Sequence, residues 1–242
     1  MSRTYLVLLA GGVGSRVGAP VPKQFVDVLG KPVIAYTLEA FQNHPEIDAI
    51  EVVCVAGYEE VLGRICRDHG ISKIFRTVAG GVDYQHSVMN GVRGLADVAQ
   101  PDDVVMIHWA ASPFVSDEII SDSIRVCREH GNAISSCPAF LLYGTNDGDC
   151  ARDVIDRDTF MTMNAPQSFL FRNAMELHDK AERTGLIDQV EPHTTTLMAR
   201  LGMPIYFSKG DQVNIKITTA RDLDLFEGFV LMKQNRSKNH QD

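Results

Sequence analysis

The sequence predicts an α/β fold, in the form of a single Rossmann-like domain with a mainly parallel sheet and a protruding β-arm. Apolar runs alternate with helical patterns through the first 140 residues. This alternation is typical of βαβ units with right-handed crossovers, in which ligands bind at the C-terminal ends of the strands. It stops at a polar stretch rich in Gly, Asn and Asp, YGTNDGDCARDVIDRD, which indicates an extended arm at about residues 139–163.

Strands are expected where short apolar runs occur without helical spacing. TYLVLLA near the N-terminus is one such run, and it leads directly into glycines. VVMIHW is another, although it ends in a histidine and the only tryptophan of the chain. We expect strands at residues 4–10, 50–56, 75–80, 104–109, 132–140 and 205–208.

Helices are expected where apolar residues recur at helical spacing behind a suitable first turn. Pro32 suits the first turn of one helix, and Ser116, followed by two acidic residues, suits the N-terminus of another. Thr219 and Asp222 form a capping-box-like start to the last helix. We expect helices at residues 32–41, 59–68, 83–95, from 116 onward, 170–184, 193–200 and 219–233. The domain should cover residues 1–234, and the polar tail at 235–242 should be disordered.

The composition is that of an ordinary globular protein, with 45% hydrophobic and 22% charged residues. A net charge of -8 argues against nucleic acid or an anionic membrane as the main partner. The five cysteines are scattered without a C-x-x-C pair, which favours reduced thiols over a zinc site or a disulfide framework. The N-terminal apolar run is too short for a signal peptide, and no run reaches membrane-spanning length. We therefore expect a cytoplasmic protein.

The most informative stretch is LLAGGVGSRVGAPVPKQF at residues 8–25. A strand runs into Gly11, Gly12 and Gly14, whose lack of a Cβ lets backbone N–H groups approach an anionic or planar ligand. Arg16 and Lys23 add positive charge suited to a triphosphate. The stretch is neither a Walker A loop nor a dinucleotide fingerprint. A tight turn without a ligand is the competing interpretation.

Four further segments, in order, extend this pattern along the chain. They are AGGVDYQHSVMNG (79–91), IHWAASPFV (107–115), NAPQSF (164–169) and NIKITTARDL (214–223). Together with the glycine loop they resemble the nucleotidyltransferases that transfer CMP from CTP to a polyol phosphate. This family comprises 2-C-methyl-D-erythritol 4-phosphate cytidylyltransferases and ribitol-5-phosphate cytidylyltransferases, and the resemblance covers essentially the whole chain. The Leu-Ala-Gly-Gly opening is closer to the ribitol-phosphate members.

The resemblance implies a homodimer that uses CTP, a phosphorylated polyol and Mg²⁺ or another divalent cation. The acceptor phosphate would attack the α-phosphorus in line, so no protein nucleophile is needed. By resemblance, the nucleotide-binding residues are Ala10, Gly11, Gly12, Val13, Gly14, Gly80, Gly81 and Ser87. The catalytic residues by resemblance are Arg16, Lys23 and Lys216, and the acceptor-binding residues are Lys216, His108, Trp109 and Arg157, the last from the arm of a partner subunit.

Several of these residues have a second interpretation from their local sequence alone. Lys216 lies in a strand-like pattern, where a lysine is usually solvated. Arg157 lies in a charged run, where an exposed ion pair of little energetic value is common. Ser87 suits the N-terminal cap of a helix. Trp109 suits a core-filling residue at a strand end.

The chain departs from the family pattern on the metal and acceptor side. Trp109 stands where the family has the aspartate that binds Mg²⁺, and Ser112 stands where it has an arginine. An indole offers no lone pair to a hard cation, so it cannot replace a carboxylate. The metal ligands are thus unknown, with Asp83, Asp211 and His108 as candidates.

Other departures concern the acceptor. Tyr84 replaces an arginine, Ala165 replaces a threonine, and His193 and Thr194 stand where the family has Thr-Asp-Glu/Asp. An aromatic pair of Trp109 and Tyr84 would suit stacking on a less charged acceptor. The function predicted is CMP transfer from CTP to a phosphorylated polyol with release of pyrophosphate. The alternative is a catalytically impaired paralogue that binds a nucleotide or pairs with an active subunit. The acceptor, and with it a role in isoprenoid or in cell-surface polymer synthesis, is undetermined.

Overall fold

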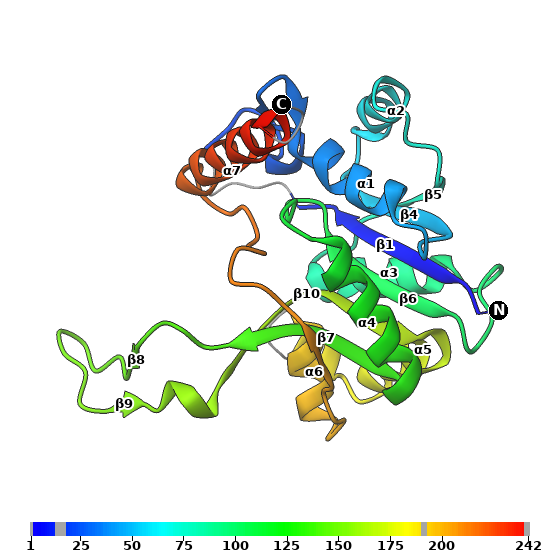
Figure 1. The fold of residues 1–242 in the computed structure, drawn as a ribbon. Helices are drawn as coiled ribbons and strands as arrows, with labels where there is room; N and C mark the ends of the chain where they lie inside the picture. The colour runs from blue at the N-terminus through cyan, green and yellow to red at the C-terminus, as the bar shows by residue number, and fades with distance from the viewer. Residues whose placement is uncertain (1, 13–17, 190–192, 240–242) are drawn as a thin grey trace.

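The computed structural model describes residues 2–12, 18–189 and 193–239. A seven-stranded sheet lies at its centre, with helices on both faces and an arm that extends far from the body (Figure 1). Its strands are β1 (Thr4–Ala10), β4 (Ala49–Cys54), β5 (Ile74–Ala79), β6 (Val104–Trp109), β7 (Asn132–Pro138), β10 (Met161–Leu170) and β11 (Phe207–Lys209). The strand order is β11-β7-β10-β6-β1-β4-β5, and all neighbours are parallel except β10, which runs antiparallel to both β6 and β7. The predicted fold class is confirmed.

The strand β10 was not predicted from the sequence. Pro166 lies inside it, and a proline normally argues against a central strand because it cannot donate a ladder hydrogen bond. The pairing of β10 with β7 shifts register between Met163 and Gln167, so the proline falls in the irregular part of the ladder. This strand carries the chain back from the arm into the sheet and makes the sheet mixed rather than wholly parallel.

Two apolar layers hold the helices on the sheet. One layer joins the sheet to α1 (Val33–Asn43), α2 (Glu59–Asp68) and α4 (Asp117–His130). The other joins it to α3 (Tyr84–Gly94), α5 (Phe171–Arg183) and α6 (Thr194–Arg200). Leu6 and Leu8 of β1 face the first layer, whereas Tyr5 and Val7 face the second, as the two-residue period of a strand requires. Both layers are buried, so the carboxyl edge of the sheet is where a ligand can reach these strands.

The last helix, α7 (Ala220–Asn239), is longer than the sequence predicted. It was expected to end at about Lys233 and to be followed by a disordered tail from residue 235. The helix instead continues through residue 239, because no glycine or proline interrupts QNRSKN and several of these residues favour helices. Near its N-terminal end, Phe226 packs edge-on against Tyr36 and Phe114, at 5.0 and 5.1 Å between ring centroids. Residues 240–242 lie outside the described residues.

The arm occupies the long excursion between β7 and β10. It contains two short paired strands, β8 (Tyr143–Gly144) and β9 (Val154–Ile155), and a 3-10 turn, η3 (Arg157–Thr159). The arm projects from the body in Figure 1, as predicted. Its exposed side chains include many large apolar ones: Phe140, Leu141, Leu142, Tyr143, Val154, Ile155 and Phe160.

Among the described residues, no helix combines the length and the apolar character that crossing a membrane would require.

Candidate active site

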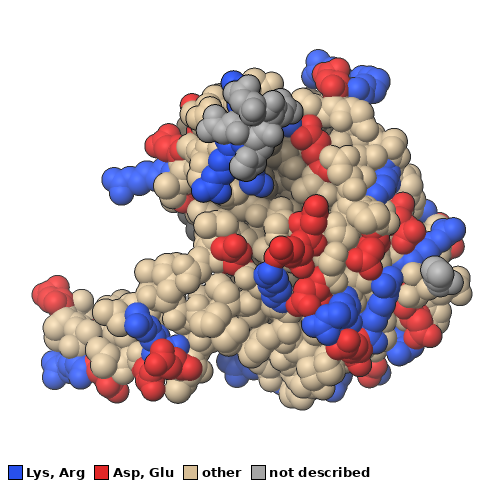
Figure 2. Space-filling model, in the orientation of Figure 1, with Lys and Arg blue, Asp and Glu red and all other residues tan. Residues whose placement is uncertain are grey.

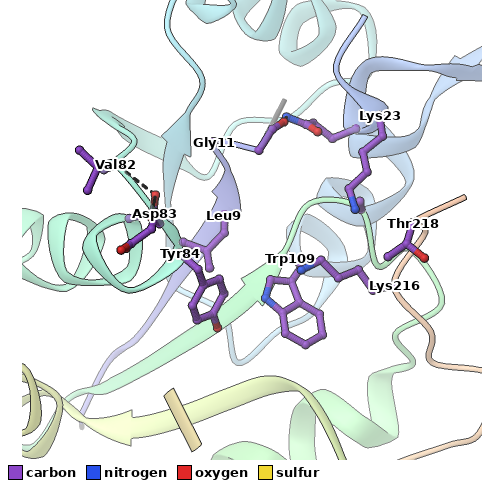
Figure 3. Close-up of a pocket in the computed structure, with 14 residues that line it drawn as sticks. Leu9, Gly11, Lys23, Val82, Asp83, Tyr84, Trp109, Lys216 and Thr218 are labelled. Atoms are coloured by element: carbon purple, nitrogen blue, oxygen red, sulfur yellow. Dashed lines mark hydrogen bonds between the residues drawn. The ribbon is translucent and has the colours of Figure 1, made fainter. Parts of the chain in front are cut away.

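A cavity of about 480 Å³ opens at the carboxyl ends of β1, β5 and β6 (Figure 3). This is the edge at which parallel α/β sheets bind ligands. One side of the cavity is formed by the loop after β1 and by the start of α3. The other side is formed by the end of β6 and by the segment that precedes α7. Its lining residues are Leu9, Gly11, Gly12, Lys23, Gln24, Gly81, Val82, Asp83, Tyr84, Ser87, Trp109, Ala111, Lys216 and Thr218.

The glycine loop is held in place by Gln24. Its side-chain Nε2 donates hydrogen bonds to the carbonyl of Ala10 at 2.7 Å and to the carbonyl of Gly12 at 2.9 Å. Gln24 is buried, and these bonds fix both ends of the short segment through Gly11. Ala10 thus lies beneath the loop, while Gly11 and Gly12 face the cavity. Gln24 lies within the glycine-rich stretch at residues 8–25, but its role was not predicted from the sequence.

The turn before α3 forms the rest of this side of the cavity, next to the glycine loop. The Ser87 hydroxyl accepts a hydrogen bond from the Gly81 N–H at 3.0 Å and donates one to the Asp83 carbonyl at 2.7 Å. Asp83 is the N-terminal cap of α3, so the interpretation of Ser87 as the capping residue is wrong. Ser87 lies one turn inside the helix, where its hydroxyl both shapes the turn and lines the cavity. Gly80 precedes the turn and is not among the lining residues.

Asp83 does not offer a clear metal site. Its carboxylate accepts the His86 N–H at 2.9 Å and lies 2.8 Å from the His86 Nδ1. Partial burial acts to raise the pKa of Asp83, but the contacts with His86 outweigh it and hold that pKa below its usual value. Asp211 accepts the backbone N–H of Val213 outside the cavity. The described residues include no group of three or more His, Cys, Asp or Glu side chains that could hold a metal ion.

The side chains at the end of β6 do not fit a protein-held Mg²⁺ either. Trp109 presents an aromatic ring and one N–H, and neither is a ligand for a hard cation. The residues of this cavity therefore disagree with the metal site that the family resemblance implies.

Two lysines, Lys23 and Lys216, line the cavity. The Lys23 Nζ donates a hydrogen bond to the carbonyl of Ile217 at 2.6 Å. The Lys216 Nζ lies 4.3 Å from the centroid of the Trp109 ring and 5.9 Å from that of the Tyr84 ring. The Ile217 N–H donates to the Ala111 carbonyl at 2.8 Å, which docks this segment onto the chain just after β6. Two ammonium groups in one cavity create a site suited to anionic ligands.

Trp109 and Tyr84 lie side by side on the floor of the cavity (Figure 3). Only 8% of Trp109 is exposed, and its Nε1 has no hydrogen-bond partner among the described residues. The hydroxyl of Tyr84 is also buried. Burial raises the pKa of Tyr84, and the nearby side chains of Thr194 and Trp109 oppose this only in part. The phenol is therefore neutral and adds no charge to the site.

His108 was predicted to bind the acceptor or a metal, and its position does not support either role. It neighbours Trp109 on β6, so its side chain points to the other face of the sheet. There it is fully buried, with its ring 5.0 Å from that of Phe41 and its Nε2 2.9 Å from the Ser112 carbonyl. Burial lowers the pKa of His108 to about 4. The imidazole is a neutral core group without access to the cavity.

Arg157 lies on the exposed arm and does not line the cavity of its own chain. Its guanidinium donates to the Phe140 carbonyl at 3.3 Å and lies 3.9 Å from the Asp158 carboxylate. Val13, Gly14 and Arg16 lie outside the described residues. The structure thus brings together, from the predicted set, Gly11, Gly12, Lys23, Gly81, Ser87, Trp109 and Lys216.

Sequence reasoning missed several lining residues altogether. Leu9 lies near the end of β1 and Ala111 lies just after β6, each beside a residue that was predicted. Val82 lies in a predicted segment without a chemical group to mark it. Thr218 follows Lys216 by two residues, so the strand-like period of that segment was a usable signal.

Comparisons with known proteins agree with this geometry. The family model for IspD, 2-C-methyl-D-erythritol 4-phosphate cytidylyltransferase, matches residues 4–232. The ribitol-5-phosphate cytidylyltransferase of Lacticaseibacillus paracasei is 38% identical over 231 residues, which cover 94% of this chain and 98% of that protein. The 2-C-methyl-D-erythritol 4-phosphate cytidylyltransferase of Clostridium botulinum is 32% identical over 228 residues, which cover 94% and 97%.

Solved structures give the same result. The 2-C-methyl-D-erythritol 4-phosphate cytidylyltransferase of Thermus thermophilus superposes with a TM-score of 0.74 at 26% identity, over 95% of this chain and 99% of that one. The 4-diphosphocytidyl-2C-methyl-D-erythritol synthase of Anaerococcus prevotii shares the fold, with a TM-score of 0.79 at 22% identity over 95% and 96%. The predicted family is confirmed, and the chain belongs to the IspD family of cytidylyltransferases.

Proposed function

We propose that this protein transfers CMP from CTP to a phosphorylated polyol, with ribitol 5-phosphate as the preferred acceptor and 2-C-methyl-D-erythritol 4-phosphate as the alternative. The observation that carries the proposal is a cavity with glycines on one side and Lys23 and Lys216 on the other. The glycine side suits a nucleotide and the lysine side suits phosphates. The preference for ribitol 5-phosphate rests on the 38% identity to the enzyme of Lacticaseibacillus paracasei.

The proposed reaction is an in-line displacement at phosphorus. An oxygen of the acceptor phosphate forms a bond to the α-phosphorus of CTP while the bond to the β-phosphate oxygen breaks. Pyrophosphate leaves with the electron pair of that bond. Because the second pKa of a phosphate monoester is about 6, the acceptor is largely dianionic at neutral pH and needs no general base. Catalysis then depends on positioning and on positive charge from Lys23, Lys216 and Arg16.

The two ends of the cavity have separate tasks in this proposal. Gly11, Gly12 and Gly81 would contact the nucleotide through their backbones, together with Ala10, Val13, Gly14, Gly80 and Ser87. Lys216 would bind the acceptor phosphate. Magnesium, or another divalent cation, would be carried by the triphosphate oxygens, because the described cavity residues do not supply a set of ligands for it.

The arm supports a second part of the proposal, a homodimer in which residues 139–163 contact the partner subunit. Leu142 is 85% exposed and Val154 is 77% exposed, and a two-stranded hairpin of this length is not stable in water by itself. Charges of both signs are gathered toward the tip of the arm, whereas its base is mostly uncharged (Figure 2). Arg157 would reach the acceptor phosphate in the partner's cavity. Residues 1–234 would form the nucleotidyltransferase domain.

We also propose that the protein acts in the cytoplasm, without nucleic acid as a partner. The net charge of -8 argues against a nucleic-acid surface, and so does the face seen in Figure 2, on which acidic and basic side chains are interspersed.

The test is release of pyrophosphate from CTP and Mg²⁺ with ribitol 5-phosphate, 2-C-methyl-D-erythritol 4-phosphate and glycerol 3-phosphate as separate acceptors. We expect turnover with ribitol 5-phosphate above the others. Lys23→Ala should lower kcat/KM by about 10²-fold, the scale of losing one donor to a transition state. Lys209→Ala, on β11 outside the cavity, is the control and should not change it. Absence of turnover with every acceptor, in a protein that binds CTP, would instead support the non-catalytic paralogue.

A further inference from the structure

We propose that Trp109 is a positioning residue, whose indole face holds the Lys216 ammonium toward the acceptor phosphate. The inference rests on the proposed function, because Lys216 is assigned to that phosphate there. It explains why a tryptophan is compatible with activity at a position where the family has a carboxylate.

The geometry is that of a cation–π contact. The Lys216 Nζ lies 4.3 Å from the centroid of the Trp109 ring, well within the distance of about 6 Å at which the ring quadrupole attracts a cation. Tryptophan is the aromatic residue that binds cations most strongly. Tyr84 provides a second, more distant ring at 5.9 Å. The ammonium is therefore held by two uncharged aromatic groups.

The indole is itself rigidly placed. Trp109 is the last residue of β6, where it lies opposite Leu9 of β1 in the sheet, and 92% of its surface is buried. Because the ring is already held in place by its surroundings, ligand binding does not have to order it.

The backbone of the lysine segment is anchored on both sides of Lys216. The Asn214 side chain donates to the Ala165 carbonyl at 2.7 Å, and the Ile217 N–H donates to the Ala111 carbonyl at 2.8 Å. These bonds fix where the lysine side chain begins. The contact with Trp109 then acts at its far end, where the charge is.

The uncharged nature of the indole matters for binding an anion. A carboxylate at position 109 would form an ion pair with Lys216 and cancel most of its charge. An aromatic ring orients the ammonium and leaves its net charge available for the acceptor phosphate. Burial is the main cause of the lowered pKa of His108, and the charge of Lys216 acts in the same direction.

A role in filling the core explains Trp109 less well than a role in positioning Lys216. Its Nε1 is buried beside the Tyr84 side chain and makes no well-formed hydrogen bond among the described residues, and a poorly paired buried N–H costs stability. A leucine would fill the core without that cost. The ring face, directed at a lysine in the cavity, is the feature that only an aromatic residue supplies.

Kinetics of two variants test the proposal. Trp109→Leu keeps an apolar side chain but removes the ring, and we expect about a tenfold rise in the KM for ribitol 5-phosphate. The KM for CTP should change little, because the nucleotide contacts lie across the cavity. Trp109→Phe retains a weaker ring and should restore part of the acceptor affinity. Equal changes in both KM values, or no difference between the leucine and phenylalanine variants, would overturn the positioning role.

A spectroscopic measurement tests the same contact without turnover. Trp109 is the only tryptophan in the chain, so the fluorescence of the full-length protein reports on it alone. Lys216→Met removes the ammonium but keeps the length of the side chain. We expect this variant to shift the emission maximum of Trp109 and to change the extent to which its emission is quenched. Lys31→Met is the matched control, because the Lys31 Nζ lies 4.3 Å over the Tyr36 ring elsewhere in the molecule. Identical emission from wild type and Lys216→Met would contradict the proposal.

The two experiments separate the proposals from each other. If wild type releases no pyrophosphate with any acceptor, the proposed function fails, and the emission of Lys216→Met still decides whether Trp109 holds the lysine. If wild type is active and Trp109→Leu has the kinetics of wild type, only the positioning role fails.

Discussion

Gly81 lies so close to the first turn of α3 that no larger residue fits there. A Cβ on Gly81 would lie 2.4 Å from the His86 Cβ and 2.7 Å from the Ser87 backbone nitrogen. The neighbouring Gly80 is different, since its added Cβ would meet the Gly11 Cα at 3.6 Å and the Ser87 Oγ at 3.7 Å. Two adjacent glycines of one motif thus have different physical reasons for being glycine.

This difference predicts the outcome of two alanine substitutions. Gly81→Ala should lower the free energy of unfolding by about 2 kcal/mol, because the turn must move to relieve the overlap. It should also weaken CTP binding, since the turn forms a wall of the cavity. Gly80→Ala is the matched control and should leave stability nearly unchanged. Urea unfolding measures the first effect and calorimetry the second; equal stability of the two variants would show that the turn yields easily.

The face of the sheet to which each side chain of β6 points is also decided residue by residue. His108 and Trp109 were both predicted to contact the acceptor, yet adjacent residues of a strand point to opposite faces. The period-two rule could have separated them without a structure. It could not have indicated which of the two side chains points into the cavity.

Among the elements, the β2–β3 hairpin contains a strained residue. Asp27–Val28 pairs with Lys31–Pro32, so Leu29 and Gly30 form a two-residue turn. Leu29 has φ 54° and Gly30 has φ 80°. Positive φ at both positions is typical of a type I′ turn, for which Asn-Gly is the preferred pair, and it is unfavourable for leucine.

Leu29→Asn should therefore stabilise the protein. The expected gain is about 1 kcal/mol, which corresponds to a rise in Tm of about 2–4 °C for a chain of this size. Differential scanning calorimetry measures it. Leu225→Asn removes another exposed leucine, on α7, where the backbone is helical, and should bring no gain. A fall in Tm for Leu29→Asn would mean that the leucine side chain contributes more than its backbone strain costs.

At the scale of the whole molecule, the arm sets the expected assembly. Its apolar side chains are exposed on a segment that the body of the domain does not cover. Leu142→Asp should convert a homodimer into a monomer, because a charge would be buried in the contact, while folding of the body should be unaffected. Multi-angle light scattering measures the mass. Leu225→Asp, on α7 away from the arm, should remain dimeric, and a wild-type monomer would refute this role of the arm.

Much of the fold was predictable because it depends on local patterns. The strands β1, β4, β5 and β6 and the helices between them follow from apolar runs, spacing and caps, and their bounds agree with the structure to within about two residues. The strand β10 was not predictable in this way. Its pairing with β6 and β7 is nonlocal, and Pro166 argues locally against it.

The sequence by itself determined the α/β class, the arm, the glycine loop and the departure at Trp109, because each of these depends on residues that are close together in the sequence. Only the tertiary structure decided which of them meet. Lys23 and Lys216 are separated by most of the chain, yet the segment through Ile217 brings both to one cavity. The Lys216 ammonium lies over the indole only because β6 and the segment before α7 dock together. Contacts between distant segments depend on packing, and packing has no signature in any single stretch of sequence.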